Sequence, residues 1–464
     1  MELMEQALAR AAGAPLVPGN AVRLLRDASE NYPAWLDAIR SAQHSVHFES
    51  YIIHEDAAGT EFAEALKARA RDGVRVRVVY DWLGGVRSTS RRFWRDLRSA
   101  GVEVRCFNPP SIGSPFGWLS RDHRKSIVVD GQVAFVTGLC VGHMWTGDPE
   151  RGIAPWRDTG VEIRGPAVAD VERAFAQVWA VTGPPLPADA RDSHPIAQAG
   201  NVAIRIVAST PWSAGLFRLD QLIAAAARRT LWLTDAYFAG IPAYIEAMRA
   251  AARDGVDVRL LVPGTSDIPI LRPLSEAGYR TLLTAGIRVF EWKGPMLHAK
   301  TAVADGRWSR VGSSNLNVAS WLGNYELDAV IEDAGFAEAM ERMYLEDLGN
   351  ATEIVLGVRR PRPRERRARG RARASAGRMA AGAIRLGNVV NAAMTDRRVL
   401  ASVEHQALIA VGALLVAVAG IFLRWPRTIA VPIAILVFWV GAVIAVKASR
   451  SLLRPRRRSR KPRA

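Results

Sequence analysis

Short alternating apolar runs and longer helical patterns follow one another over most of this chain. Residues 45–53 and 74–80 show the period-two alternation of strands, and residues 56–72 lie between them with a helical pattern. Residues 20–43 predict an amphipathic helical entry with a break at Pro33. Strands alternating with helices predict an α/β fold with mostly parallel sheets flanked by helices.

The order of these segments occurs twice, which indicates an internal duplication. Residues 70–77 (ARDGVRVR) return as residues 252–259 (ARDGVDVR), and residues 101–104 (GVEV) return as residues 286–289 (GIRV). The repeat predicts two like domains related by a pseudo-twofold axis. A proline-rich segment at 183–200 is the expected boundary between them.

Two apolar runs near the C-terminus, residues 407–423 and 429–446, are each just long enough to cross a bilayer. The alternative is a buried helical hairpin, but nothing after residue 354 supplies a soluble core to cover it. Nine of the fifteen residues at 359–373 are arginine. We therefore expect a first domain at 1–182, a linker at 183–200, a second domain at 201–358, an Arg-rich linker at 359–404, a two-span transmembrane hairpin at 405–447 and a basic tail at 448–464.

The net charge of +17 is concentrated at the C-terminal end. From residue 359 onward 24 Lys and Arg face three acids, a balance of +21, so residues 1–358 carry −4. A nucleic-acid enzyme more often spreads positive charge around its groove, so we expect no nucleic-acid partner. Both flanks of the hairpin are basic, which predicts that they lie on the cytoplasmic side. The N-terminus shows no secretory signal, and the two cysteines, Cys106 and Cys140, predict neither a disulfide framework nor a Cys-based zinc site.

The candidate chemistry lies in two copies of one pattern, His-x-Lys-x4-Asp. The two copies are His123, Lys125 and Asp130, and His298, Lys300 and Asp305. A neutral imidazole can attack phosphorus, while a protonated second imidazole gives its proton to the leaving alkoxide. Two lysines can hold the phosphoryl oxygens, so we expect neither a metal nor another cofactor. We interpret the two aspartates of the motif as anchors of the turn that follows each strand.

The paired motifs resemble those of the phospholipase D superfamily, and their context resembles the bacterial cardiolipin synthases within it. The resemblance spans about residues 15–350 and includes Glu49-Ser50-Tyr51-Ile52, Trp156-Arg157-Asp158 and Gly312-Ser313-Ser314-Asn315. It implies that His123 is the nucleophile and His298 the acid and base, although the symmetry of the motifs leaves the reverse assignment open.

The resemblance also implies supporting residues. Asp158 and Glu326 stand where the family places the carboxylates that orient the histidines, with ordinary surface acids as the alternative. Ser313 and Asn315 are expected to donate hydrogen bonds to the phosphoryl oxygens.

The first copy departs from the family pattern because Val141 occupies the place of the expected asparagine. Four further residues are candidates for either substrate contact or plain packing: Glu49, Tyr51, Asp235 and Tyr237. We expect no catalytic role for Cys140 or His143.

These observations favour a cardiolipin synthase that transfers a phosphatidyl group onto phosphatidylglycerol. Its expected partners are the membrane and phospholipids, with phosphatidylethanolamine as a second candidate substrate, and its expected location is the bacterial inner membrane with the catalytic domains on the cytoplasmic side. The alternatives are a phospholipase D that releases phosphatidic acid, a nuclease of the same superfamily, and a membrane tether with a decayed site.

Overall fold

The structure, a computed structural model, describes most of the part of the chain that carries the two motifs. The described residues are 2–110, 119–187, 196–268, 271–356 and 397–400, with 424, 438 and 439. They belong to two compact units, the first formed by residues 1–109 and 120–401 and the second by residues 110–119 and 402–464. Of the second unit only residues 110, 119, 424, 438 and 439 are described, the last three as helical.

The predicted hairpin therefore falls almost wholly outside the described residues, as does most of the Arg-rich linker and all of the basic tail. No helix within the described ranges combines the length and the apolar character needed to cross a membrane.

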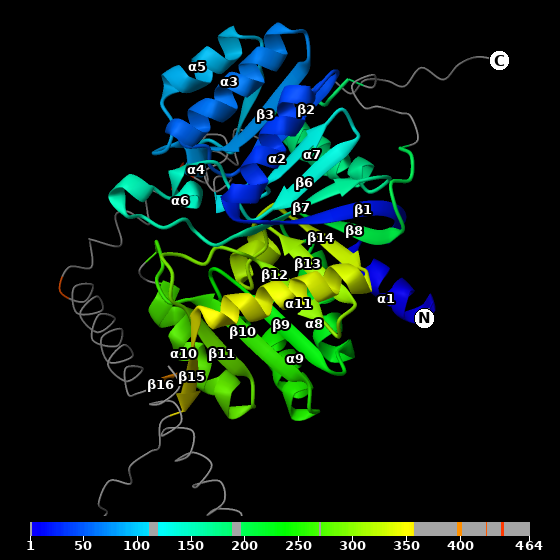
Figure 1. Ribbon diagram of the computed structural model, residues 1–464, viewed down its shortest axis with the longest axis vertical. Helices are drawn as coiled ribbons and strands as arrows, with labels where there is room; N and C mark the ends of the chain where they lie inside the picture. The colour runs from blue at the N-terminus through cyan, green and yellow to red at the C-terminus, as the bar shows by residue number, and fades with distance from the viewer. Residues whose placement is uncertain are drawn as a thin grey trace, which may run out of the picture. The chain divides into compact units, whose positions relative to one another are not determined.

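The first unit is organised around one sheet of sixteen strands. Their order is β16-β15-β11-β10-β9-β12-β13-β14-β8-β1-β7-β6-β5-β2-β3-β4. In Figure 1 the first repeat, in blue to cyan, and the second, in green to yellow, lie on opposite sides of the central strands β1 and β8. The outward order of strands is the same on both sides, which confirms the predicted duplication.

The bounds of the elements follow the repeat. The N-terminal part comprises α1 (Glu2–Ala12), β1 (Val17–Arg26) and α2 (Asp27–Ser41). The first repeat comprises β2 (Ser45–Ser50), α3 (Ala57–Arg71), β3 (Arg75–Asp81), α4 (Trp82–Gly85), α5 (Arg91–Ser99), β4 (Glu103–Phe107), β5 (Ser126–Val129), β6 (Val133–Thr137), α6 (His143–Thr146), η2 (Pro149–Arg151), β7 (Thr159–Arg164) and α7 (Val168–Val181). The second comprises β8 (Val202–Ser209), α8 (Gly215–Ala226), β9 (Thr230–Thr234), α9 (Pro242–Arg253), β10 (Asp257–Pro263), α10 (Leu271–Thr284), β11 (Arg288–Trp292), β12 (Thr301–Ala304), β13 (Trp308–Gly312), η4 (Ala319–Gly323), β14 (Glu326–Glu332), α11 (Ala334–Gly349), β15 (Ala351–Leu356) and β16 (Arg397–Leu400).

The prediction of a mostly parallel sheet is wrong, because the sheet is mixed. Parallel pairing is confined to β2–β3–β4, to β9–β10–β11 and to β15–β16. Helices link the strands of the first two sets, as a parallel crossover requires. The next strands of each repeat are joined by tight turns instead, and β5–β6 and β12–β13 are antiparallel hairpins.

The helical entry predicted for residues 20–43 is also partly wrong. Residues 17–26 form β1, which pairs with β7 on one side and with β8 on the other. Burial along this strand does not alternate, so its sequence carries no period-two signal. Helix α2 then runs through Pro33 without ending there.

The two repeats share a core, which explains why they form one compact unit. An apolar cluster joins Val128 and Val161 of the first repeat to Leu261, Leu297 and Leu327 of the second. Each repeat also has a separate cluster under its own helices. The shared cluster brings the starts of β5 and β12 to the same region of the molecule.

Candidate active site

The two His-x-Lys pairs occupy equivalent positions, immediately before short buried strands. His123 and Lys125 precede β5, and His298 and Lys300 precede β12. β5 pairs with β2, and β12 pairs in the same antiparallel way with β9. Both pairs therefore lie beside the C-terminal ends of β2 and β9. Strand ends of this kind are the usual place for a ligand site in α/β sheets.

Each histidine is held by a carboxylate from the opposite repeat. The Nδ1 atom of His123 lies 2.9 Å from Oε2 of Glu326, and Nδ1 of His298 lies 2.7 Å from Oδ2 of Asp158. Both carboxylates are fully buried. Since Nδ1 is engaged, the other ring nitrogen, Nε2, is the atom of each imidazole left for chemistry.

Backbone hydrogen bonds repeat this exchange between the halves. The His123 N–H donates to the carbonyl of Tyr325 at 2.9 Å, and the His298 N–H donates to the carbonyl of Arg157 at 2.7 Å. Tyr325 and Arg157 directly precede the two carboxylates. Each histidine is thus fixed at its backbone and at its ring by one segment of the other repeat.

Asp158 and Glu326 each accept a further hydrogen bond, from different kinds of residue. The Ser313 hydroxyl donates to Glu326 at 2.6 Å, whereas the indole N–H of Trp145 donates to Asp158 at 3.2 Å. Burial acts to raise the pKa of each carboxyl, but the adjacent histidine and lysine outweigh it and hold both pKa values below their ordinary range. Both groups are therefore ionised at neutral pH.

A buried ion-pair cluster supports the Asp158 segment. The Arg157 guanidinium binds both oxygens of Asp347 at 2.9 Å and one oxygen of Asp27 at 3.0 Å. Bidentate pairing of this kind fixes the geometry of the guanidinium. Arg157 therefore ties the segment that carries Asp158 to α11 and to the start of α2.

The motif lysines are buried beside their histidines. Lys125 Nζ donates to the His123 carbonyl at 2.6 Å, and Lys300 Nζ donates to the His298 carbonyl. Each ammonium also faces a tyrosine ring, Tyr51 at 5.5 Å and Tyr237 at 5.7 Å. Burial lowers the pKa of Lys300 to about 8, with Asp158 opposing the shift.

Burial also keeps both imidazoles neutral. It lowers the pKa of His298 to about 3, with Lys300 acting in the same direction and Asp158 against it. The pKa of His123 is lowered for the same first reason, with Glu326 opposing the shift. A neutral imidazole whose Nδ1–H donates a hydrogen bond to a carboxylate presents a lone pair at Nε2, which is the form that attacks phosphorus.

Asp130 and Asp305 lie away from the histidine rings, at the turns after β5 and β12. Both have left-handed backbones, with φ of +53° and +54°. Asp130 accepts from the backbone N–H groups of Gln43, His44 and Ser45. Asp305 accepts in the same way from Arg228, Arg229 and Thr230. Each aspartate thus joins the turn after its strand to the segment that leads into β2 or β9.

A cavity of about 310 Å³ joins the two halves of the site. Its lining residues are Tyr51, Ile52, Arg121, His123, Lys125, Cys140, Met144, Trp145, Trp156, Tyr237, Asp267, Ile268, His298 and Asn324. The sequence-based candidates Tyr51 and Tyr237 line it, and Cys140 lines it too. His143 instead pairs with Asp56 at 2.9 Å.

Two other candidates support the site without lining the cavity. Glu49 accepts from the Ser126 hydroxyl at 2.9 Å, beneath Lys125. Asp235 accepts from the backbone N–H groups of Tyr237 and Leu316, and burial raises its pKa to about 7. Glu49 therefore supports the start of β5, next to Lys125, and Asp235 supports the segment that carries Tyr237.

The two repeats differ in the residue that follows the motif strands, which is Val141 in the first repeat and an asparagine in the second. Val141 is fully buried in the apolar cluster of the first repeat. Asn315, its counterpart, is 4 % exposed, and its side-chain oxygen has no hydrogen-bond partner among the described residues. The second repeat thus supplies a side-chain amide that the first does not.

Sequence reasoning missed the aromatic wall around His298. The rings of Trp145, Trp156 and Tyr237 lie 5.6–5.8 Å from its imidazole. Trp156 belongs to the Trp156-Arg157-Asp158 segment of the family resemblance, so its position near a catalytic group was open to prediction. Trp145 and Asp267 carried no comparable signal, because Trp145 lies in the single-turn helix α6 and Asp267 lies in a loop.

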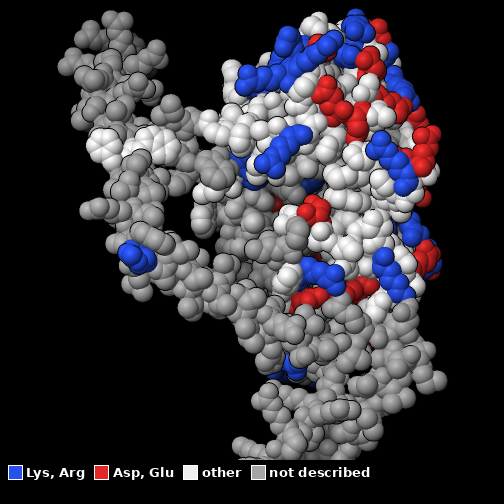
Figure 2. Space-filling view, turned by 90° about the vertical axis from the view of Figure 1, so that its left-hand side faces the viewer, with Lys and Arg blue, Asp and Glu red and all other residues white. Residues whose placement is uncertain are grey.

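The surface around the site is not strongly charged. On the side of the molecule that carries α4 and α6, Figure 2 shows basic and acidic residues together toward the end formed by α3 and α5, and a few charged side chains of both signs beside a hollow in the middle of the face. No three His, Cys, Asp or Glu side chains within the described ranges gather as a metal site requires.

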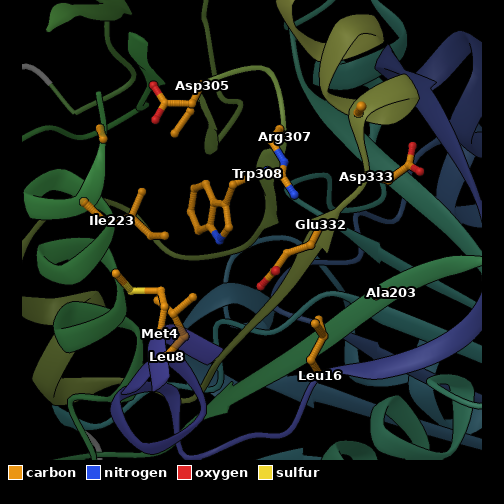
Figure 3. Close-up of a pocket in the computed structure, with 14 residues that line it drawn as sticks. Met4, Leu8, Leu16, Ala203, Ile223, Asp305, Arg307, Trp308, Glu332 and Asp333 are labelled. Carbon is orange, nitrogen blue, oxygen red and sulfur yellow. The ribbon is translucent and has the colours of Figure 1, made fainter. Parts of the chain in front are cut away.

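A larger cavity, of about 520 Å³, lies elsewhere (Figure 3). Met4 and Leu8 of α1, Ile223 and Trp308 line it, together with Asp305 at the far end of β12 from Lys300. The Asp305 carboxylate is already used by three backbone amides, and neither motif histidine lines this space. The catalytic constellation therefore belongs to the smaller cavity.

Comparisons with known proteins agree with this assignment. The family described as "Cardiolipin synthase, PLD-like domain" matches residues 35–179 and 219–348, one segment in each repeat. Cardiolipin synthase A of Pseudomonas fluorescens (strain SBW25) is 35 % identical over 351 residues, which cover 73 % of this chain and 71 % of that protein. Cardiolipin synthase 1 of Bacillus anthracis is 31 % identical over 357 residues, 74 % of this chain and 69 % of that protein.

A solved structure shows the same fold. The phosphatidylserine synthase of Haemophilus influenzae Rd KW20 superposes with a TM-score of 0.58 at 14 % identity, over 75 % of this chain and 91 % of that one. The matched segments contain both His-x-Lys pairs and both carboxylates of the site. This chain belongs to the cardiolipin synthase family of phospholipase D-like proteins.

Proposed function

We propose that this protein is a phosphatidyltransferase that makes cardiolipin by joining two phosphatidylglycerol molecules through a phosphohistidine intermediate. The pairing of each histidine with a carboxylate of the opposite repeat carries the proposal. It orients two imidazoles toward one cavity, as a two-step displacement requires.

In the first step Nε2 of His123 attacks phosphorus. A P–N bond forms, the P–O bond to the glycerol head group breaks, and the imidazolium form of His298 gives its proton to the departing oxygen. In the second step neutral His298 takes the proton of the acceptor hydroxyl, whose oxygen attacks phosphorus and breaks the P–N bond. The products are cardiolipin and free glycerol.

The lowered pKa of His123 suits this sequence, whereas the lowered pKa of His298 opposes proton donation until substrate binds. His123 is held neutral for attack, and the anionic phosphate raises the pKa of His298 on binding, so that His298 can carry the proton it must give. Lys125, Lys300 and Asn315 then hold the phosphoryl oxygens as charge develops. The Ser313 hydroxyl, expected from the sequence to join them, instead donates to Glu326. The near symmetry of the site keeps the reverse assignment of the histidines as the alternative.

The runner-up activity is hydrolysis, in which water replaces the acceptor alcohol and phosphatidic acid is released. The test is to supply labelled phosphatidylglycerol, with and without phosphatidylethanolamine, and to identify every lipid product. Cardiolipin with free glycerol supports transfer between two phosphatidylglycerol molecules. Phosphatidic acid alone would replace this proposal with a phospholipase D.

We further propose that residues 405–447 form a membrane hairpin that holds the catalytic domains at the cytoplasmic face of the inner membrane. The argument is the length of the two apolar runs and their basic flanks. Strand β16 pairs with β15, so a truncation that spares the fold ends after residue 401. That shortened chain should leave the membrane fraction and keep activity on lipid in detergent micelles; membrane binding that survives an alkaline carbonate wash would place the anchor elsewhere.

We also keep the proposed domain limits, 1–182 and 201–358. They rest on the strand order, which repeats on either side of β1 and β8.

A further inference from the structure

The catalytic cavity carries one carboxylate among the described residues that line it, that of Asp267. Two other lining residues are cations, Arg121 and Lys125, and two are the catalytic histidines, His123 and His298. The remaining titratable groups of the lining are the phenols of Tyr51 and Tyr237 and the Cys140 thiol. A carboxylate is unexpected in a site for anionic lipids, because it repels the phosphate that the lysines attract. Its presence therefore calls for a ligand group that donates hydrogen bonds.

Asp267 is held in place through Tyr237. The Tyr237 hydroxyl donates to Oδ1 of Asp267 at 2.8 Å, and burial raises the pKa of Tyr237 well above its ordinary value, so the hydroxyl keeps its proton. The Tyr237 ring lies 5.8 Å from that of His298. Since Tyr237 uses Oδ1, the second carboxylate oxygen, Oδ2, remains for a ligand.

Tyr237 is itself fixed by its backbone. Its N–H donates to Asp235 at 3.0 Å, and its carbonyl accepts from the Asn317 side chain at 3.0 Å. Asp267 is exposed and lines the cavity, and its bond to Tyr237 places it on the His298 side. That is the side on which the leaving and the entering alcohol oxygens exchange protons with His298.

We infer that Asp267 is a specificity-determining residue that accepts a hydrogen bond from the terminal O–H or N–H group of a short polar head group. Glycerol and ethanolamine both offer such a donor close to the reacting oxygen, whereas water and simple alcohols do not. Asp267 thereby favours transfer to polyol or amino-alcohol head groups over hydrolysis. The inference rests on the proposed phosphatidyl transfer.

The experiment is a competition between soluble acceptors, using the full chain in detergent with a labelled phosphatidyl donor. Glycerol, ethanolamine and 1-propanol are supplied at equal concentration, and the phosphatidyl products are quantified. Their ratio does not depend on the rate of the first step, because all three alcohols compete for the same phosphohistidine. The wild-type enzyme should favour glycerol or ethanolamine over 1-propanol.

Asp267→Asn should lower that preference about 10- to 100-fold, the range for loss of a hydrogen bond to a charged group. The asparagine keeps an oxygen for the Tyr237 hydroxyl, so the position of the tyrosine is retained. The control is Asp254→Asn, at an exposed position after α9, which should leave the ratio unchanged. A fall confined to glycerol or to ethanolamine identifies which head group Asp267 recognises.

An unchanged product ratio in Asp267→Asn, with normal turnover, overturns this inference and leaves phosphatidyl transfer intact. Complete loss of turnover also overturns it, because Asp267 would then act by positioning Tyr237 and His298. If the wild-type enzyme forms cardiolipin but no phosphatidyl alcohol, this inference alone fails. If it forms neither product, the proposed function fails and the inference fails with it.

Discussion

The two repeats share one backbone plan but surround their histidines differently. His298 lies among the rings of Trp145, Trp156 and Tyr237, and its side chain is 6 % exposed. His123 has the Tyr51 ring beside it at 5.1 Å, and its side chain is 13 % exposed. The same strand order therefore presents one imidazole in an aromatic enclosure and the other in a more open setting.

The oxygen-binding residues also differ between the repeats. Gly312-Ser313-Ser314-Asn315 of the second repeat corresponds to Gly138-Leu139-Cys140-Val141 of the first. Ser313 binds Glu326, whereas Leu139 is part of the apolar core. Duplication has preserved the scaffold and the His, Lys and carboxylate positions, while the neighbouring side chains have diverged. The comparison teaches that the two halves carry unequal shares of one site.

The largest expected effect tests the exchange of carboxylates between repeats. Glu326→Gln and Asp158→Asn should each lower turnover about 10²- to 10⁴-fold, because the histidine loses the partner that sets its tautomer. Turnover in detergent micelles, with far-UV circular dichroism as a check of folding, measures the effect. Glu338→Gln, on the exposed face of α11, is the matched control.

The double variant sharpens this test. Since both carboxylates serve the same reaction, the double variant should be little worse than the more damaged single variant. Losses that simply multiply would show that the two carboxylates act independently of each other. Single variants that each keep about half of the activity would indicate two separate sites, one in each repeat.

The next effect concerns the amide that one repeat has and the other lacks. Asn315→Ala should lower turnover about 10²- to 10³-fold, as loss of one preorganised donor to a developing anion does. Val141→Ala removes apolar volume from a core and should lower the denaturation midpoint rather than turnover. Equal losses of turnover in the two variants would show that the halves do not divide the work as described.

Lysine titration gives a smaller, pH-dependent effect. The pKa of Lys300 is lowered to about 8, so its charge is present below that pH and lost above it. We expect kcat/KM to fall about tenfold per pH unit above pH 8. Lys300→Arg should remove this alkaline limb, since the guanidinium stays protonated. Lys67→Arg serves as the control, and a limb that persists in Lys300→Arg would assign it to another group.

The smallest effect on activity is expected at the motif aspartates. Asp130→Asn and Asp305→Asn weaken the acceptor of three backbone N–H groups while keeping a side chain that tolerates positive φ. Each should cost about 1–3 kcal/mol of unfolding free energy in denaturant titration. Turnover per folded molecule should change little. A loss of turnover comparable to that of the carboxylate variants would place these aspartates in the chemistry.

Much of this architecture could be predicted from local signals. The sequence predicted the helix that ends before Gly73 and the strand that follows it. It also predicted the duplication and both His-x-Lys pairs. The parallel sheet was predicted wrongly, although Asp130-Gly131 and Asp305-Gly306 are hairpin signals that indicated antiparallel strands. The sequence could not predict that each histidine is paired with a carboxylate of the opposite repeat, because that pairing depends on how the two repeats pack. The enclosure of His298 by Trp145 has the same origin.

The most direct test of a single site built by both repeats is to trap the intermediate. Enzyme mixed with labelled phosphatidylglycerol is quenched, digested and analysed by mass spectrometry under conditions that preserve phosphohistidine. We predict one phosphatidyl group per chain, carried by His123 and lost in both His123→Ala and Glu326→Gln. Label on His298 alone would exchange the roles of the two histidines. Label on both histidines of the same chain, or on neither, would contradict a single covalent site shared between the repeats.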